Sequence, residues 1–268
     1  MPLMSEQSTL SPPAPRSAGV PPRSGIWLSY GNLLRWMMAQ TGAMLPFVIV
    51  VQALLAAGII IGFGFVIPDI DTSSAQFLST GTPTVLLMFI GLVMVPHSVA
   101  QARTTGTFTY LRSLPVPRPL LLMADLAIWL LVALPSVAVA VVVAHLRYGF
   151  GYSFDWPVLL TASILAAVTA TAVGYAIAVS LPPLITQLVT QVLVFFVMLF
   201  SPVTFPASQL PTWFQAVHDV LPFRAGADLL RAGLLADTYT ASWRDLVVLL
   251  AWCALGVAVG IRALTRRN

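Results

Sequence analysis

Residues 83–118 read PTVLLMFIGLVMVPHSVAQARTTGTFTYLRSLPVPR, and their character changes in the middle. The first part, up to about residue 101, is an apolar run of the length that crosses a hydrocarbon core of about 30 Å. The second part carries Arg103, Arg112 and Arg118 among threonines and prolines. Arginine beside an apolar run favours the cytoplasmic face of a membrane. The stretch therefore predicts a membrane span that leads into a cytoplasmic loop.

The whole chain has the composition of a membrane protein. Of its 268 residues, 58% are hydrophobic and 8% are charged, whereas roughly 25% of the residues are charged in an ordinary soluble domain. Its mean hydropathy is +0.91. Apolar blocks fall at about 44–67, 83–101, 120–144, 158–181, 184–204 and 246–264. We therefore expect an all-α polytopic membrane protein with six transmembrane helices.

The distribution of arginine predicts the orientation of these spans. With the N-terminus inside, the cytoplasmic side holds Arg16, Arg23, Arg35, Arg103, Arg112, Arg118, Arg262, Arg266 and Arg267. The outside then holds Arg147, Arg224, Arg231 and Arg244. This asymmetry satisfies the positive-inside rule. We expect a multi-pass protein of the cell membrane with both termini in the cytoplasm.

Several classes of function are excluded by what the sequence lacks. No lysine occurs anywhere in the chain, and both P-loop ATPases and pyridoxal enzymes require one. The arginines do not cluster with aromatic residues, which argues against nucleic acid as a partner. Residues 1–25 are rich in proline and serine and have no apolar centre, so they predict a disordered cytoplasmic tail and not a secretory signal.

Residues 26–40, IWLSYGNLLRWMMAQ, have the pattern of an interfacial helix. One helical face carries the apolar side chains Ile26, Trp27, Tyr30, Leu33, Leu34, Met37 and Met38. The helix would either anchor the chain in the membrane surface or act as a lever that contacts a cytoplasmic partner.

The loop after the second span predicts a short helix with an apolar ridge. Phe108, Leu111 and Leu114 recur at three-residue spacing before Pro115 and Pro117 end any helix. With the three arginines of this loop beside it, the ridge would dock into a groove on a soluble protein. Alternatively, the helix would lie on the cytoplasmic leaflet.

The segment 201–235, between the fifth and sixth apolar blocks, predicts two short amphipathic helices. Prolines at 202, 206, 211 and 222 exclude one continuous helix. The first helix has an apolar face that includes Trp213, Phe214 and Val217. The second has a charged face formed by Arg224, Asp228 and Arg231. These helices are too short and too charged to span, so we expect them to dip into the outer leaflet.

These segments, in this order around six spans, resemble the permease subunits of the ABC type-2 family, also called type V exporters, which include daunorubicin-resistance-like pumps. The resemblance covers residues 26–268. It is carried by GTFTYLRSLPVPR at 106–118 and by SPVTFPASQLPTWFQAVHDVLPFRAGADLLRAGLL at 201–235. The chain departs from the family at Ala102, Thr104 and Thr109, where acidic residues are frequent.

The resemblance implies a permease domain at 26–268 that pairs with a second permease, identical or related. It also implies two cytoplasmic ABC ATPase subunits, which bind ATP and magnesium. Residues 103–113 would be a coupling helix, and 206–235 would be external re-entrant helices. The expected coupling residues are Arg103, Phe108, Leu111, Arg112 and Leu114. The expected external gate comprises Trp213, Phe214, Val217, Arg224, Asp228 and Arg231.

No catalytic set is visible in the sequence. The three histidines lie in separate segments, and no metalloprotease, serine hydrolase or Cys-His pattern accompanies them. We therefore expect no enzyme site, metal or cofactor on this chain. Asp125, inside the third span, is a candidate intramembrane polar site by default, although an acid near a helix N-terminus also has a structural explanation. His97, near the end of the second span, is a second candidate.

Three classes of function compete for such a chain. A secondary transporter or channel would show several buried acids and repeated halves, and an embedded enzyme would need convergent polar groups. Neither pattern is evident, so an ATP-coupled permease is favoured. Drugs, lipids and lipid-linked glycans are all compatible with its apolar composition.

Overall fold

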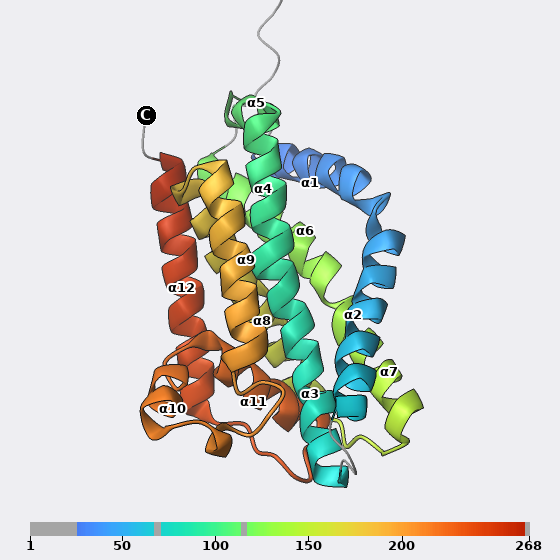
Figure 1. The fold of residues 1–268 in the computed structure, drawn as a ribbon. Helices are drawn as coiled ribbons and strands as arrows, with labels where there is room; N and C mark the ends of the chain where they lie inside the picture. Colours follow the sequence, from blue (N-terminus) through green and yellow to red (C-terminus); the bar gives the residue numbers. More distant parts are fainter. Residues whose placement is uncertain (1–25, 67–70, 114–116, 266–268) are drawn as a thin grey trace, which may run out of the picture.

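Helices account for most of the residues that the computed structural model describes, which are 26–66, 71–113 and 117–265 (Figure 1). The predicted tail at 1–25 lies outside the described residues. In order, the elements are α1 (Ile26–Gly42), α2 (Leu45–Val66), α3 (Thr72–Phe89), the π-helix η1 (Ile90–Met94), α4 (Val95–Thr104), α5 (Thr107–Ser113), α6 (Arg118–Ala133), α7 (Pro135–Tyr148), α8 (Trp156–Ser180), α9 (Pro183–Phe200), the 3₁₀ helix η2 (Ala207–Gln209), α10 (Thr212–His218), α11 (Pro222–Leu234) and α12 (Trp243–Thr265).

Six helical segments of the described chain are long and apolar enough to cross a membrane, which confirms the predicted number of spans. They are Leu45–Phe65, Thr72–Thr104, Arg118–Tyr148, Trp156–Ser180, Pro183–Phe200 and Trp243–Thr265. The protein is therefore an all-α polytopic membrane protein. The predicted start of the second span was wrong, and the third span is interrupted at Pro135; both features have a physical cause.

The second span begins at Thr72, about one-third of its length before the predicted start. Its early residues include Ser79, Thr80 and Thr82, which lower the hydropathy of the sequence there. In the structure these three residues are buried. The Thr80 and Thr82 hydroxyls donate to carbonyl oxygens of the preceding helical turn, at 2.8 Å to Gln76 and 2.8 Å to Leu78. Because these hydroxyls are satisfied within the helix, the segment can cross the membrane.

The third span is broken into α6 and α7 at Leu134, directly before Pro135. Proline cannot donate to a helical carbonyl, so a break leaves backbone acceptors unpaired. The buried side chain of Gln52 on α2 donates to the Val132 carbonyl oxygen at 3.0 Å. A neighbouring helix thus satisfies the broken turn, as the interior of a membrane requires.

Helix α8 lies in the middle of the bundle and contacts α3, α4, α6, α9, α11, α12 and η1. Its closest contact is with the wide turn η1. A Cβ atom at Gly174 would lie 1.9 Å from the Gly91 carbonyl oxygen, and one at Gly91 would lie 2.4 Å from the Ala170 Cβ. Only glycine allows the two backbones to approach so closely, which is how small residues hold helices together in lipid.

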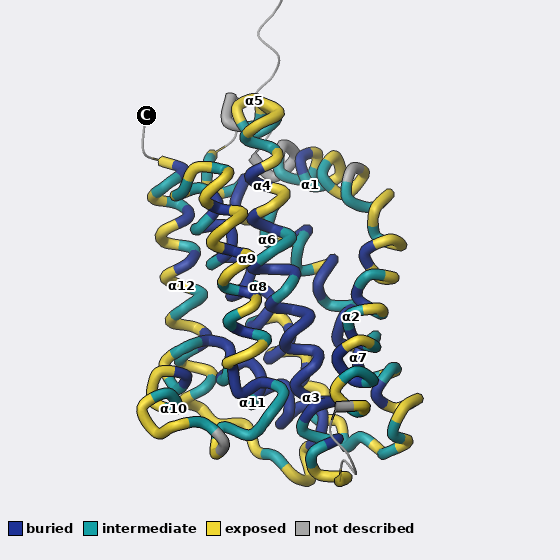
Figure 2. Tube along the Cα trace, in the orientation of Figure 1, coloured by how far each residue is buried: buried dark blue, intermediate teal, exposed yellow. Residues whose placement is uncertain are grey.

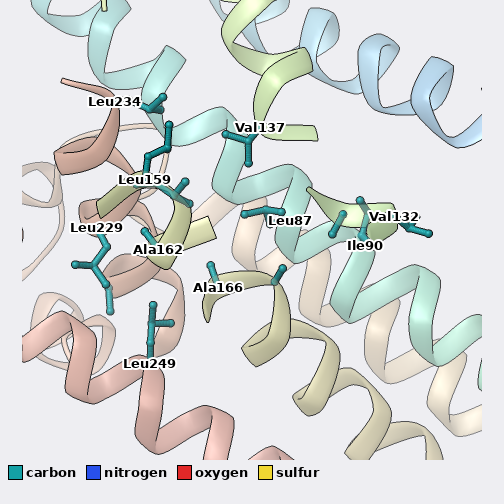
Figure 3. Close-up of a cluster of buried hydrophobic side chains, with 14 of the residues drawn as sticks. Leu87, Ile90, Val132, Val137, Leu159, Ala162, Ala166, Leu229, Leu234 and Leu249 are labelled. Carbon is teal, nitrogen blue, oxygen red and sulfur yellow. The ribbon is translucent and has the colours of Figure 1, made fainter. Parts of the chain in front are cut away.

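The largest buried cluster of the described residues joins α2, α3, η1, α6, α7, α8, α11 and α12 (Figure 3). It includes Leu87, Val132, Ala166, Leu230 and Leu249, all at most 2% exposed. Figure 2 shows this buried region along α3, α8 and α11, whereas much of α9 and α12 is exposed. In a bilayer such packing is stabilised by dispersion and fit more than by exclusion of water.

The bundle has two distinct ends (Figure 1). At one end, here named the α5 end, α5 projects beyond the spans, α1 lies across the bundle and α12 finishes. At the opposite end, named the α11 end, α10 and α11 fill the connection between α9 and α12. The predicted interfacial helix, loop helix and pair of short helices are therefore all present, at the expected positions along the chain.

Candidate functional site

The α5 end is built by a sharp turn between α4 and α5. Helix α4 ends at Thr104, and Gly106 adopts a φ of 82° before α5 begins. This left-handed conformation is readily adopted only by glycine. The Tyr110 amide donates to the Gly106 carbonyl oxygen at 3.0 Å, which ties the first turn of α5 to the turn before it.

Two residues of the apolar ridge of α5, Phe108 and Leu111, pack against their own chain, whereas the ridge was expected to dock into a partner. Phe108 is half-buried against a cluster that includes Leu122 and Tyr175. Leu111 is half-buried against the cluster of Leu33 and Leu121. The physical reason is that α1 and α6 offer apolar side chains beside α5, so the ridge packs against its own chain.

Arg103 also has an internal role that the sequence did not predict. Its Nη1 atom donates to the carbonyl oxygens of Ala178 and Leu181, both at 2.5 Å, at the C-terminal end of α8. Arg118 does the same for α12, donating to Leu264 O at 2.9 Å and Thr265 O at 3.2 Å. Cations at helix C-termini satisfy free carbonyls and the helix dipole. The Arg112 side chain and Leu114 lie outside the described residues.

The outer surface of α5 consists of polar residues and one aromatic. Thr109 and Tyr110 of α5 are exposed, as is Thr105 in the turn before it, and Tyr110 is 60% exposed. We name these three residues the α5 tip. Because Phe108 and Leu111 are three residues apart, they share one face of the helix, and Thr109 and Tyr110 between them lie on the other. This spacing could have identified the outward surface from the sequence.

At the α11 end, α10 attaches to α9 through aromatic rings. The ring centroid of Phe214 lies 6.1 Å from that of Phe196 and 6.4 Å from that of Phe200, and both pairs of rings are edge to face. Trp213, by contrast, is 67% exposed and Val217 is 45% exposed. Of the three expected apolar gate residues, only Phe214 is partly buried against its own chain. Trp213 and Val217 present an apolar surface outward.

The charged face of α11 was expected to point to water, but one of its charged residues, Arg231, is buried. The Arg231 side chain is 1% exposed, and its Nη1 atom lies 2.7 Å from Asp228 Oδ1. Its Nη2 atom donates to the Val203 carbonyl oxygen. Burial lowers the pKa of the Arg231 guanidinium, and the neighbouring Asp228 carboxylate opposes that shift. Nearly all the neighbouring residues of α11 are also buried, so the Arg231 charge lies inside the bundle. The ion pair with Asp228 compensates this buried charge.

Arg224, Asp228 and Asp219 form a chain of ion pairs at the surface of α11. Arg224 pairs with Asp219, and its Nε atom lies 3.4 Å from Asp228 Oδ2. Arg244, at the start of α12, reaches Asp219 Oδ2 at 3.4 Å. Alternating charges thus join the end of α10, helix α11 and the start of α12.

These charges surround a cavity of about 210 Å³ at the α11 end. The lining residues are His218, Asp219, Arg224, Ala225, Asp228, Ser242, Arg244 and Asp245. His218 is fully buried, and its Nε2 atom has no hydrogen-bond partner. Sequence analysis missed His218 and Asp245, because neither stands in a recognisable motif and only the fold brings them together.

The two candidate intramembrane residues do not form one site. Asp125 on α6 is hydrogen-bonded to the Tyr175 hydroxyl of α8. His97 is exposed on α4, a helix that packs against α8 and α9. The Asp125 contact links two helices, which is the structural explanation for an acid at that depth.

A third polar feature lies on the surface of α4 and α9, which stand side by side (Figure 1). His97, Ser98 and Gln101 on α4 are exposed, as are Gln187 and Gln191 on α9. Polar side chains that face lipid are costly. We name these five residues the α4–α9 polar face.

The described chain is thus a membrane-embedded bundle of six spans, with a projecting helix at one end and a buried arginine at the other. The sequence matches the model of the ABC-2 family transporter proteins over residues 68–262. The match covers well over half of the chain, and the protein belongs to this family. It is therefore the membrane component of an ABC transporter, as the sequence resemblance implied. A comparison with curated proteins gives no significant match.

Proposed function

We propose that this chain is the permease of an ABC exporter, and that it moves a lipophilic or lipid-linked substrate out of the cytoplasm. ATP and magnesium would be bound by separate ATPase subunits. The observation that carries the proposal is the arrangement of the two ends: α5 projects beyond the spans at one, and α10 with α11 closes the other (Figure 1). A permease that is driven by ATPase subunits on one side of the membrane needs a contact surface for them on that side. It also needs a part that closes the pathway on the opposite side.

The charges support a cytoplasmic location for the α5 end. At the α11 end, Arg224, Arg231 and Arg244 are each paired with an aspartate. At the α5 end, Arg103 and Arg118 bind only helix carbonyl oxygens among the described residues. Uncompensated positive charge thus accumulates at the α5 end, which the positive-inside rule places in the cytoplasm.

The α5 tip is the surface that we assign to the ATPase. A partly exposed tyrosine supplies a large, rigid contact at low entropic cost, and such residues dominate many interfaces. Tyr110 would enter a groove on the ATPase, and Thr105 and Thr109 would contact its rim. The inward ridge of Phe108 and Leu111 would transmit the motion to α1, α6 and α8, against which it packs.

The α4–α9 polar face supports pairing with a second permease subunit. Five exposed polar residues are poorly suited to lipid but suited to a protein interface or a hydrated path between two subunits. An apolar hollow of about 400 Å³ on α9, lined by Leu188, Val192 and Phe196 among others, lies next to this face. A lipophilic substrate would fit such a surface.

The test is reconstitution with the ABC ATPase encoded beside or co-purified with the permease. We expect a stable complex whose ATP hydrolysis is stimulated by lipophilic compounds, lipids or lipid-linked glycans in a panel. The matched controls are the ATPase alone and the permease alone. Transport that continues without ATP, driven by an ion gradient, would instead assign the chain to the secondary transporters.

A further inference from the structure

Among the described residues, the cavity at the α11 end contains one buried imidazole nitrogen without a hydrogen-bond partner and one half-buried carboxylate without an ion pair. The Asp245 carboxylate makes no ion pair within 4 Å among the described residues. The His218 Nε2 atom is buried and unpaired. Unsatisfied buried polar atoms are rare in folded proteins and each requires an explanation.

The hydrogen bond of His218 determines what its free nitrogen can bind. Its Nδ1 atom lies 3.0 Å from the Phe214 carbonyl oxygen. A carbonyl oxygen only accepts, so Nδ1 carries a proton, and in the neutral form of the imidazole Nε2 is then an acceptor. Both unpaired groups, Nε2 and the Asp245 carboxylate, therefore require a donor. A positively charged donor with several N–H bonds, an ammonium group, suits both.

The other charged side chains of the cavity already make two ion pairs each, except Arg244. Asp219 and Asp228 each pair with two arginines, and Arg224 pairs with both aspartates. Arg244 makes a single ion pair, at 3.4 Å, and its side chain is 62% exposed. Its guanidinium has donors to spare at the mouth of the cavity, where an anionic phosphate would be bound.

A metal ion is a poorer fit for this cavity. Structural and catalytic zinc sites use three or four protein ligands. Within the described part of the chain, no group of three His, Cys, Asp or Glu side chains is arranged to hold a metal.

The position of the cavity indicates the source of the ligand. Two of its lining residues, Arg244 and Asp245, directly follow the exposed Trp243 in the first turn of the membrane span α12. Exposed tryptophans at a span end mark the level of the lipid headgroups. The ligand is therefore most accessible from the bilayer.

We propose that this cavity binds a zwitterionic lipid headgroup with a primary ammonium next to a phosphodiester, as in phosphatidylethanolamine. The ammonium donates to Asp245 and His218 Nε2, and the phosphodiester contacts Arg244. A bound lipid would join α10, α11 and α12, the segments that close this end. The lipid-binding proposal can be tested separately from transport, because binding is measured on the purified permease without substrate or ATPase.

The test uses the purified full chain in nanodiscs that contain equal parts of phosphatidylethanolamine, phosphatidylcholine and phosphatidylglycerol. Retained lipid is then counted by native mass spectrometry. We expect preferential retention of phosphatidylethanolamine, which falls about tenfold in Asp245→Asn, because a charge-assisted hydrogen bond is lost. His218→Phe should weaken retention in the same direction. Asp237→Asn, an equal charge change at an exposed residue outside the cavity, should retain the lipid as the native chain does.

Three outcomes distinguish the possibilities. Equal retention of phosphatidylcholine, whose quaternary ammonium has no N–H, would overturn the assignment. Unchanged retention in a folded Asp245→Asn variant would overturn it as well, and a cavity filled by water alone would give this result. Binding of soluble phosphoethanolamine without enrichment of the lipid would support the chemistry and assign it to a free ligand.

Discussion

The Arg231 guanidinium lies 3.6 Å from the centroid of the Phe77 ring. Phe77 belongs to α3 and Arg231 to α11, and the same guanidinium also binds Val203 in the connection after α9. One buried side chain therefore joins three segments at the α11 end. Cation–π contacts and charge-assisted hydrogen bonds are strongest where water is excluded.

Arg231→Ala should strongly destabilise the permease. It removes these contacts and leaves Asp228 with only Arg224 as an ion-pair partner, so we expect a loss of about 3–5 kcal/mol. Arg244→Ala, which removes an exposed arginine of the same network, should cost about 0–1 kcal/mol. Thermal unfolding in detergent measures both. Equal melting temperatures for the two variants would show that the buried contacts are not stabilising.

The contact between Gly91 and Gly174 makes a second prediction about stability. A methyl group at position 174 would overlap the Gly91 carbonyl oxygen, so Gly174→Ala should cost about 1–3 kcal/mol through overpacking. Gly58→Ala is the matched control, because nothing lies within 4 Å of a Cβ there. That variant should be neutral or stabilising by up to about 1 kcal/mol, since alanine favours helix. The same unfolding assay separates the two.

Much of this fold was predictable because membrane spans are encoded locally. Each span is a continuous apolar run, and its length follows from the thickness of the bilayer. The start of α3 was missed because hydropathy counts hydroxyls as polar, whereas Thr80 and Thr82 bond within their own helix. Similarly, the break at Pro135 is visible in the sequence, but its support by Gln52 depends on the packing of α2.

The candidate site was less predictable because it depends on which direction a face points. Periodicity showed that Phe108 and Leu111 share one face of α5, but it does not say whether that face meets the same chain or another. Burial answers this question, since both side chains pack on the permease. The cavity at His218 and Asp245 required two helices to meet, and no local pattern records such a meeting.

The orientation of the chain can be tested by cysteine labelling in intact cells. Thr105 lies at the α5 end and Thr240 precedes α12 at the α11 end, and both are exposed. If the α5 end is cytoplasmic, an impermeant reagent should label Thr240→Cys and not Thr105→Cys. The native Cys253 lies inside a span and serves as the background control. The reverse pattern of labelling would invert the proposed orientation.

The role of α10 as an external closure makes different predictions for adjacent residues. Phe214 packs against Phe196 and Phe200, so Phe214→Ala should lower the stability by up to about 3 kcal/mol, the lower end for a buried phenylalanine. Trp213 is exposed, so Trp213→Ala should preserve the fold but raise ATP hydrolysis without substrate, or solute leak from proteoliposomes. Leak of a small fluorescent solute and folded yield are measured for both variants. If Trp213→Ala changes neither leak nor coupling, α10 acts only as an anchor at the membrane surface.

The two faces of α5 lead to opposite phenotypes, which tests the assignment of the coupling surface. Leu111→Asp places a carboxylate against Leu33 and Leu121, so it should reduce folded yield, because an unpaired buried charge costs several kcal/mol. Tyr110→Ala should leave the yield unchanged and weaken ATPase binding by about 2 kcal/mol, or about thirtyfold, as expected for an interface anchor. Trp156→Ala, which removes an exposed aromatic ring at the first residue of α8, controls for the loss of a surface ring. Yield is measured by size-exclusion chromatography and binding by titration of the ATPase. If Leu111→Asp folds normally and loses the ATPase while Tyr110→Ala retains it, the apolar ridge must leave the permease to meet its partner, and the α5 tip is not the docking surface.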